Sequence, residues 1–547
     1  VGGLSEGRRY RSWFTLDLQS LHRPLDDCIH ETPEGDLAVA AGSFGFRGRM
    51  GPSALAAFLE GFDGTWRQLS ETTGQFVILL HKDGRIWVSS DRGNMAHVYL
   101  DTRSGAVSSS YLMLGDAGRP HTVDRLSLLE RLYLGSTTGE RTVFREIDRL
   151  PAAHAIEMTP DAMKLTALDV ASQPSSPRSF RDAVDDVRSR LIELFTAYRT
   201  MHPGRITTPL TGGFDSRLIV AVLRAVGATP DLLVYGGASD IDVRIAKNIA
   251  AVEGLTLDHI DKSEHPTPSA DEFPAVLEES FVTHDGRGTL GVFGNGSDIP
   301  SRIRRAADGA MYLNGGGGEI YRNFWKVLNA GTTVIDFLHH RYERIDRRAL
   351  RDPADWNRML ERLADAYADL VGAQDGCLTR EQIDGLYVRQ RIRYWMSPDN
   401  QVNNLFGPAM LPFSEPALTE PSLRLPVPWR ENGRFQAALI TSLDAGLASY
   451  PSAYGWSFDA VAPLKTRLRT WLKLRIPTFI RRRYQRRAYA QLTFMPERPF
   501  WAQSPWREAV FEDRPLRISE YVDVEAIHGK NQLNRAFTLE LLLRRFT

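Results

Sequence analysis

Cysteine is scarce in this chain of 547 residues, which contains only Cys28 and Cys377. Two cysteines this far apart in sequence argue against a disulfide framework and are typical of a reducing compartment. Net charge is also absent, because 67 Lys and Arg residues balance 67 Asp and Glu residues. This balance provides no overall attraction to nucleic acid or to a membrane surface.

Long apolar runs are missing as well, so no membrane-spanning segment is predicted. The N-terminal stretch "VGGLSEGRRYRSW" lacks the apolar core of a signal peptide. Val1 is an unusual first residue, so we expect that the natural start was processed, trimmed or altered. The histidines share no ligand spacing with cysteines, so no zinc site is predicted. We therefore expect a cytoplasmic protein.

Residues 1–170 are predicted to form a domain dominated by antiparallel sheet. Segments such as "GQFVILLHKDGRIWVSSDRG" alternate apolar and polar residues around plausible hairpin turns at residues 82–84 and 103–105. The stretch "AIEMTPDAMKLTALDV" indicates one more hairpin. Residues 171–180 are rich in Pro and Ser and are predicted to be a linker, which leaves 181–547 as a second domain.

The second domain is predicted to begin with a helix capped by Ser179 and to continue as alternating strands and helices. The expected strands are "RITTPL", "DLLVYGG" and "TLDHIDK", and the expected helices are "RLIVAVLRAVG" and "DIDVRIAKNIAAVEG". Short connections between such elements are typical of a doubly wound parallel sheet. From Thr332 onward the pattern is mainly helical, so a helical C-terminal extension is expected.

The turn "LTGGFDSR" joins the first of these strands to its helix. Gly212 and Gly213 let backbone amides face inward, and the helix N-terminus adds unpaired N–H groups and the positive end of a dipole. Thr211 and Ser216 add hydroxyl donors. Asp215 would repel a bare phosphate, which suggests a bridging Mg²⁺ and hence a nucleotide pyrophosphate. A capped strand-to-helix turn with no ligand is the alternative.

Four segments in order resemble the asparagine synthetase-like family, whose members adenylate a carboxylate with ATP. "LTGGFDSR" resembles the pyrophosphate loop of the N-type ATP pyrophosphatases. "VYGGASDIDVRIAKNIAAVEGLTLDHID", "AMYLNGGGGEIYR" and "GPAMLPFSEPALTEPSLRLP" resemble three later segments of that family. The first half, including "LSETTGQFVILLHKDGRIWVSSDRGNMAHVYL", resembles the family's amidotransferase domain. The resemblance implies an Ntn-like antiparallel domain before an α/β ATP-pyrophosphatase domain.

The resemblance also implies a set of site residues and the cofactors ATP and Mg²⁺. Asp215 and Glu319 are expected to hold the metal, with Lys465 as the candidate for stabilising the adenylate. The expected nucleotide-binding residues are Leu210, Thr211, Gly212, Gly213, Phe214, Asp215, Ser216, Tyr235, Gly236, Gly315 and Gly316. Arg217 and Arg322 are candidates for contacting a substrate carboxylate or phosphate.

Two departures from the family's pattern limit the expected reaction. The family's glutaminase uses a cysteine at the mature N-terminus, and Cys28 lies inside the chain without a free α-amine. Gly316 also stands where relatives carry a glutamate or tyrosine in the glycine-rich loop, so the general base must come from elsewhere. These departures favour an amine carried by the substrate, as in β-lactam synthetases and lasso-peptide cyclases. A glutamine-hydrolysing enzyme remains the alternative if the natural N-terminus carries Cys.

The predicted function is therefore an AMP-forming carbon–nitrogen ligase acting on a small molecule or peptide with a carboxylate and an amine. A homodimer or a pathway partner protein is possible. The basic stretch Lys465 to Arg487 could bind tRNA or an anionic membrane, but a solvated helical face is favoured. A tRNA-modifying adenylase and a non-catalytic scaffold are the remaining alternatives.

Overall fold

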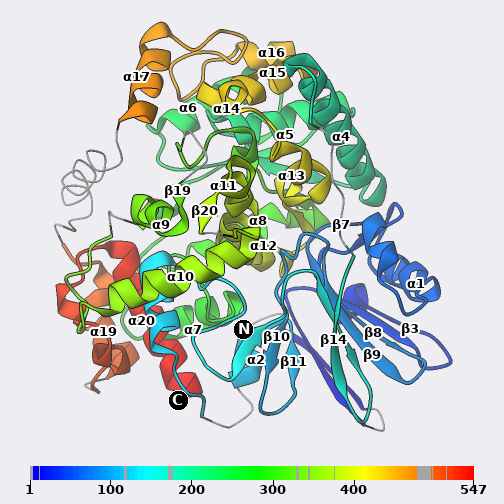
Figure 1. Cartoon of the computed structure of the whole chain (residues 1–547), viewed down its shortest axis with the longest axis vertical. Coiled ribbons are helices and arrows are strands. Elements are labelled where there is room, and N and C mark those ends of the chain that lie inside the picture. Colours follow the sequence, from blue (N-terminus) through cyan, green and yellow to red (C-terminus); the bar gives the residue numbers. More distant parts are fainter. Residues whose placement is uncertain are drawn as a thin grey trace.

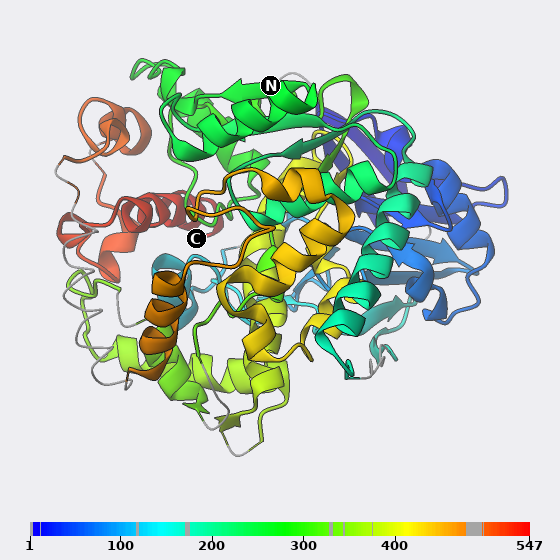
Figure 2. The same ribbon diagram turned by 90° about the horizontal axis from the view of Figure 1, so that it is seen from above.

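The computed structural model describes residues 4–10, 13–115, 120–169, 176–327, 332–342, 345–374, 376–476, 495, 497–512 and 514–547. These residues form a mixed α/β fold that combines antiparallel sheets, one five-stranded parallel sheet and many helices (Figure 1). Figure 2 shows the N-terminal strands in blue and the C-terminal helices in red on opposite sides of the molecule, with the parallel-sheet region between them. In the described part of the chain, every helix is too short or too polar to traverse a bilayer.

The largest antiparallel sheet has six strands in the order β14-β13-β9-β8-β4-β3. Their bounds are β3 Ile29–Glu31, β4 Leu37–Gly42, β8 Phe76–Lys82, β9 Arg85–Ser90, β13 His154–Met158 and β14 Met163–Ala167. Asp83 and Gly84 both have positive φ in the turn between β8 and β9, which is the geometry of a tight two-residue hairpin. The predicted hairpins in this half are therefore confirmed.

Smaller strands and helices surround this sheet. They are β1 Leu4–Tyr10, β2 Thr15–Leu21, β5 Gly45–Phe46, β6 Arg49–Met50, β7 Thr72–Thr73, β10 Tyr99–Asp101, β11 Val107–Ser108, β12 Ile147–Arg149, α1 Pro52–Glu60, α2 Tyr111–Gly115 and α3 Arg125–Leu134. Helix α1 covers one face of the six-stranded sheet, and its buried Leu55 and Phe58 join Phe76 and Ile78 in a core of their own.

The parallel sheet has the strand order β17-β16-β15-β18-β21. Its strands are β15 Ile206–Pro209, β16 Asp231–Tyr235, β17 Leu257–Ile260, β18 Met311–Leu313 and β21 Ala409–Met410. Helices α5 Phe214–Ala225 and α6 Ile241–Glu253 connect the first three strands. The predicted alternation of strands and helices is confirmed, and Ser179 caps α4 (Phe180–Met201) by accepting a hydrogen bond from the Asp182 N–H.

The rest of the described chain is mainly helical, as predicted. The longer elements are α7 Phe273–Thr283, α8 Asp298–Arg305, α9 Val334–Tyr342, α10 Asp355–Val371, α11 Arg380–Leu386, the π-helical η6 Tyr387–Met396, α12 Ser397–Asn404, α13 Pro416–Ser422, α15 Arg434–Leu443, α17 Leu464–Arg475 and α20 Lys530–Phe546. The first half of the predicted linker, residues 171–175, and the second half of the basic stretch, residues 477–487, lie outside the described residues.

One large core joins the two ends of the chain. Phe144, from the first half, stacks on Phe546 of α20 at a centroid distance of 4.6 Å, and both rings are buried. The His121 N–H also donates to the Phe546 carbonyl. The C-terminal helix therefore packs on the first 170 residues, whereas the division into residues 1–170, 171–180 and 181–547 stays a prediction.

Candidate functional site

The turn after β15 lies at the carboxyl edge of the parallel sheet, where ligands bind in folds of this kind. Gly213 is the N-cap of α5, and Asp215 lies in the first turn of that helix. The turn is closed by its own hydrogen bonds. The Ser216 hydroxyl accepts from the Thr211 N–H at 3.0 Å, and the Thr211 hydroxyl accepts from the Gly213 N–H at 3.1 Å. Donors suited to a phosphate are therefore gathered in one turn.

A neighbouring residue on α6 completes the hydrogen bonding of this turn. The Gly212 N–H donates to the Asp242 carboxylate at 2.8 Å, and the Thr211 and Ser216 hydroxyls lie 2.9 Å apart. The backbone N–H groups of Thr211, Gly212 and Gly213 thus each have a protein oxygen as their partner in this state. A phosphate would have to exchange for those oxygens, which costs little where the replaced bond is of equal strength.

The glycine-rich loop after β18 packs directly against this turn. A Cβ on Gly315 would lie 3.5 Å from the Ser216 Cα, and a Cβ on Gly318 would lie 2.3 Å from Asp215 Oδ1. Gly317 has φ +91°, a conformation that favours glycine. The run of glycines therefore allows two loops at the sheet edge to approach more closely than side chains would permit.

Two acids and one arginine meet where these loops touch. An Arg322 Nη2–H donates to Asp215 Oδ2 at 2.6 Å and lies 3.5 Å from Glu319 Oε1. The other Asp215 oxygen accepts from the Gln436 amide at 2.7 Å, and Glu319 Oε2 accepts from the Tyr387 hydroxyl at 2.5 Å. Asp215 and Glu319, which are 104 positions apart in sequence, are thus bridged by one guanidinium.

Burial shifts the pKa values of the groups in this cluster. Desolvation raises the pKa of Asp215 from its ordinary 3.8 to about 6 against the opposing effect of Arg322, and Glu319 adds to the rise. Burial beside Glu319 also raises the pKa of Tyr387 well above its usual range, so that the hydroxyl stays protonated and donates. A cation added between the two carboxylates would lower the pKa of Asp215.

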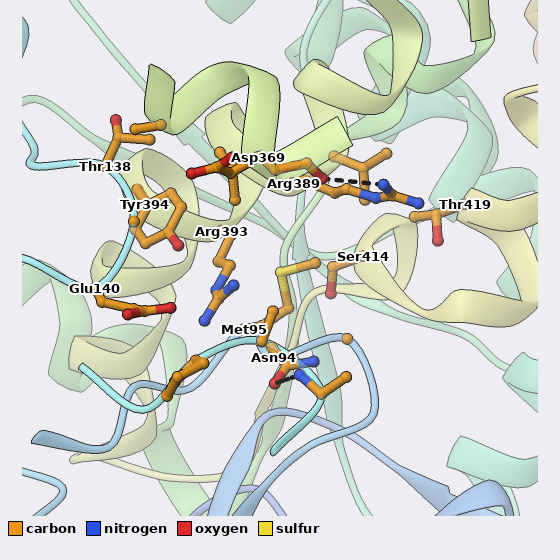
Figure 3. A pocket seen from close by; sticks show the side chains of 18 of the residues that line it. Asn94, Met95, Thr138, Glu140, Asp369, Arg389, Arg393, Tyr394, Ser414 and Thr419 are labelled. Atoms are coloured by element: carbon orange, nitrogen blue, oxygen red, sulfur yellow. Dashed lines mark hydrogen bonds between the residues drawn. The ribbon is translucent and has the colours of Figure 1, made fainter. Parts of the chain in front are cut away.

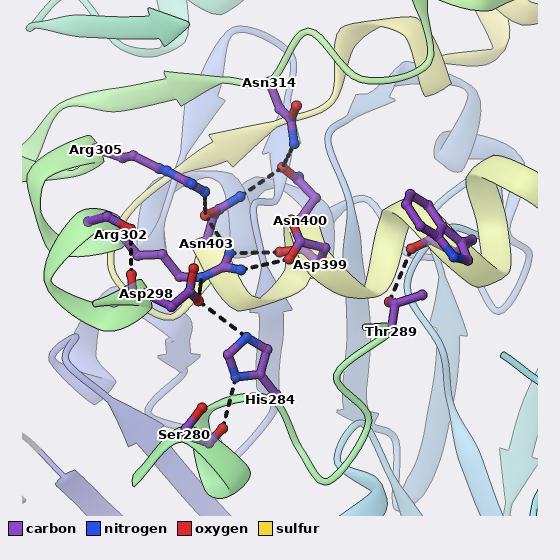
Figure 4. A network of polar contacts seen from close by, with 12 residues as sticks. Ser280, His284, Thr289, Asp298, Arg302, Arg305, Asn314, Asp399, Asn400 and Asn403 are labelled. Atoms are coloured by element: carbon purple, nitrogen blue, oxygen red, sulfur yellow. Dashed lines mark hydrogen bonds and ion pairs between the residues drawn. The ribbon is translucent and has the colours of Figure 1, made fainter. Parts of the chain in front are cut away.

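A buried polar network holds the glycine-rich loop in place (Figure 4). The Asn314 side chain accepts from the Gly316 N–H at 2.9 Å and donates to Asn400 at 3.1 Å. Asn400 in turn donates to the Gln75 side chain, at the start of the antiparallel strand β8, at 2.7 Å. Arg302 ties α8 to α12 through Asp399 at 2.6 Å. The network thus links the candidate site to the antiparallel sheet.

Residues 450–458 cover the turn from the other side. The Ala453 N–H donates to the Gly212 carbonyl at 3.0 Å, and the Phe458 ring stacks on Phe214 at 4.0 Å. The Tyr454 ring also lies against Phe214, and its hydroxyl accepts from Arg322 at 3.2 Å. The cover therefore contacts both the turn and the arginine of the acidic cluster.

Three of the predicted site residues have positions that change their expected roles. The side chains of Leu210 and Phe214 are fully packed in the core, so only their backbone can face a ligand. Arg217 is buried and donates to the Tyr450 and Pro451 carbonyls at 2.8 Å each, so it anchors the cover instead of contacting a substrate.

Lys465 is exposed near the start of α17, and no contact among the described residues joins it to the acidic cluster. Tyr235 is the last residue of β16 and Gly236 follows it, as expected, and the Tyr235 hydroxyl accepts from Arg305 at 2.7 Å. Gly315 and Gly316 lie in the loop beside the turn.

Sequence reasoning missed Tyr387, Gln436 and Tyr454 as members of the cluster. Tyr387 lies on η6, Gln436 on α15 and Tyr454 in the cover, and none belongs to a local motif with Asp215 or Glu319.

The donor set fits a magnesium ion that also takes phosphate oxygens. Within the described residues, no three His, Cys, Asp or Glu side chains gather into a metal site. Two carboxylates with the remaining positions filled by phosphate and water are nevertheless the usual arrangement for Mg²⁺. A cavity of about 10 Å³ beside Glu319, Arg322 and Tyr387 has room for about one water.

Comparisons with known proteins add little to this geometry. No protein-family model and no curated protein matches the chain. Among the solved structures that match is a glutamine phosphoribosylpyrophosphate amidotransferase from B. subtilis complexed with ADP and GMP. It is 9% identical, with a TM-score of 0.17, over 43% of this chain and 48% of that chain, so about half of its length is spanned. A likeness at that TM-score establishes neither a common fold nor a common activity.

Proposed function

We propose that this chain is an ATP-dependent, AMP-forming carbon–nitrogen ligase. The observation that carries the proposal is the meeting of Asp215, Arg322 and Glu319 beside a turn rich in phosphate donors, at the carboxyl edge of the parallel sheet. A substrate carboxylate would attack the α-phosphorus of ATP, which releases pyrophosphate and leaves an acyl-adenylate. An amine would then displace AMP and form the amide.

The turn residues would bind the phosphates. The Gly213 N–H and the hydroxyls of Thr211 and Ser216 are donors within one turn, and the N-terminus of α5 favours negative charge there. Asp215 and Glu319 would hold Mg²⁺, which supplies charge stabilisation to the leaving pyrophosphate. Tyr235 and Gly236 would lie near the adenine or ribose because they end the neighbouring strand.

Arg322 is the residue whose role depends most on the ligand. In this state it donates to Asp215 and lies 3.5 Å from Glu319, and its side chain is 20% exposed. A metal between the acids would release it to bind a phosphate oxygen in the bidentate manner that guanidinium favours. Arg322 would then stabilise charge that develops on the leaving group.

The antiparallel half is proposed to be an Ntn-like amidotransferase domain of the asparagine synthetase-like family that supplies no ammonia. Burial raises the pKa of the Cys28 thiol, which keeps it in the un-ionised, unreactive form. The attacking amine would therefore come with the substrate, as in β-lactam synthetases and lasso-peptide cyclases. This half would instead contribute to the wall of the substrate site.

The test compares the wild type with Asp215→Asn and with Asp261→Asn. Asp261 directly follows β17, and its carboxylate accepts from Ser263 instead of from a member of the cluster. Binding of Mg-ATP is measured by equilibrium dialysis, and AMP formation is followed by mass spectrometry with pools of candidate acids and peptides. We expect Asp215→Asn to abolish AMP formation and Asp261→Asn to retain it. Undiminished AMP formation by Asp215→Asn would refute the metal role. A wild type that binds no ATP would favour the non-catalytic scaffold.

A further inference from the structure

A cavity of about 970 Å³ lies between the loops of the antiparallel half and helices α10, η6 and α13 (Figure 3). Its volume is at the upper end of the roughly 300–1,000 Å³ typical of ligand pockets, so it is large for ammonia or a single small acid. Asn94 and Met95 line it from the first half, and Arg393, Tyr394 and Ser414 from the second.

The wall of this cavity carries charges of both signs, most of them satisfied by the protein. Three of its arginines have partners: Arg92 lies 3.5 Å from Glu420, Arg362 donates to Asp124 at 2.7 Å, and Arg389 donates to the Leu370 carbonyl at 3.0 Å. Two further arginines, Arg141 and Arg424, lie nearer the outside of the wall.

Arg393 differs from these arginines because it is buried and, in the part of the chain that the structure describes, has no hydrogen-bond or ion-pair partner. Its residue is only 6% exposed, its Nε has no hydrogen-bond partner among the described residues, and its guanidinium carbon lies 4.9 Å from the centroid of the Tyr394 ring. The side chain points into the open space of the cavity in Figure 3. The charge of Arg393 opposes the rise in the pKa of the buried acid Asp91. The Asp91 carboxylate, however, already accepts hydrogen bonds from the N–H groups of Gly93, Met95 and Ala96.

A buried guanidinium without a counter-ion is unfavourable, since desolvation of the charge is not offset. An anionic group of a ligand in the cavity would supply the missing partner in a charge-assisted hydrogen bond. Acids on the same wall, including Glu140, Asp369 and Glu420, would repel a polyphosphate or a nucleic acid. A single carboxylate on a molecule with other polar and positive groups suits this wall better, and peptides carry that combination.

The cavity adjoins the proposed catalytic cluster. Val388 and Leu423 line both this cavity and the small cavity beside Glu319. The π-helical η6 carries Tyr387, which bonds Glu319, and Arg393, which faces the large cavity. π-Helical turns occur frequently at functional sites. The helix η6 therefore sets the distance between Tyr387, which bonds Glu319, and the guanidinium of Arg393.

We propose that this cavity binds a peptide substrate, and that Arg393 binds a carboxylate of that peptide remote from the carboxylate that is activated. The proposal rests on the proposed ligase function and names its substrate class. The binding energy of the remote carboxylate would place the reacting groups beside Glu319 and Arg322.

The experiment uses the full chain and a library of tetrapeptide amides in matched pairs that differ only by Asp against Asn or Glu against Gln. Bound peptides are identified by affinity selection with mass spectrometry. We expect the wild type to retain the acidic member of a pair about tenfold or more over its amide. Arg393→Gln should lose this preference, whereas Arg393→Lys should keep part of it.

Arg389→Gln removes an equal charge from the rim of the same cavity and should change the preference less than about threefold, because its guanidinium is already bonded. An absent acid preference in the wild type, a preference that survives in Arg393→Gln, or an equal loss in Arg389→Gln would overturn the proposal. Retention of inorganic pyrophosphate through Arg393 in place of peptides would overturn the choice of carboxylate.

Melting temperature separates binding from a structural role. Arg393→Gln should melt at or above the temperature of the wild type, because it removes an unpaired buried charge. A markedly lower melting temperature would indicate a structural residue and contradict the proposal, and Arg393→Met gives the same readout if the Gln variant does not fold. Retention of acidic peptides by a chain that binds no ATP would support this site while refuting the ligase. ATP binding without retention of acidic peptides would support the ligase while refuting this peptide site.

Discussion

Substitution of Gly318 by alanine is the sharpest test of the way the two loops meet at the candidate site. The added Cβ would lie 2.3 Å from Asp215 Oδ1, where ordinary contact begins at 3.4 Å, so one of the two must move by about 1 Å. Asp215 cannot move freely, because Arg322 and Gln436 hold its two oxygens at 2.6 and 2.7 Å. The loop or the carboxylate would therefore leave its present position.

The expected effect on binding is larger than the effect on stability. Overpacking of this kind costs about 1–3 kcal/mol of folding free energy. Misplacement of a catalytic group by about 1 Å costs on the order of a hundredfold in activity. We expect Gly318→Ala to fold, to melt a few degrees lower, and to lose about a hundredfold in magnesium-dependent AMP formation. Binding of a non-hydrolysable ATP analogue, followed by calorimetry, should weaken with it.

Gly316→Ala is the matched control within the same loop. Its Cβ would meet Asn314 Oδ1 at 3.3 Å and Leu411 Cδ1 at 3.4 Å, contacts that small shifts can accommodate, and its φ is not in the left-handed region. This variant should stay within a few fold of the wild type. The reasoning would be refuted if Gly318→Ala bound the analogue as well as Gly316→Ala does, because the close approach of Gly318 to Asp215 would then be irrelevant to the site.

Three further variants test other parts of the structure. Burial raises the pKa of Glu415 from its ordinary 4.5 to about 7, so the wild type should lose up to about 3 kcal/mol of stability as the pH rises from about 4.5 to about 7. Glu415→Gln, which can still accept from Tyr198, should lack this loss in urea unfolding at a series of pH values; parallel pH profiles would contradict the pKa shift. Arg217→Met removes two charge-assisted bonds to the Tyr450 and Pro451 carbonyls and should cost about 2–4 kcal/mol in thermal unfolding, whereas a loss below about 1 kcal/mol would show that the cover is anchored elsewhere. Tyr387→Phe frees the Glu319 carboxylate from its orienting hydroxyl and should weaken the apparent affinity for Mg²⁺ in the presence of ATP by about 10–100-fold; an unchanged magnesium titration would remove Glu319 from the proposed metal site.

Much of the fold was predictable because its signals are local. The hairpin at Asp83 and Gly84 follows from two residues that tolerate positive φ between alternating strands. The β15–α5–β16–α6–β17 alternation follows from apolar runs with short connections. The cap of α4 at Ser179 depends only on the three residues that follow it. In each case the residues that decide the structure are neighbours in sequence.

The candidate site was predictable only in part because its contacts are not local. The motif around Asp215 and the loop around Glu319 each carry a sequence signal, but Tyr387 and Gln436 approach them from helices that carry none. Phe214 looks like a loop residue in sequence and becomes the anchor of the cover once Phe458 stacks on it. Tertiary packing decides such roles, and periodicity does not report it.

The position of Arg322 couples the acidic cluster to the cover. Its guanidinium donates to Asp215 and to the Tyr454 hydroxyl, and its plane lies over the Phe214 ring at 5.7 Å. A guanidinium cannot keep all these contacts while binding a phosphate, since its donors have a fixed planar geometry. Under the proposed function, a nucleotide that draws Arg322 away from Asp215 would therefore also weaken the hold on Tyr454. Binding of the phosphates would then be coupled to release of the cover, because Arg322 would exchange its contact with Tyr454 for a contact with phosphate.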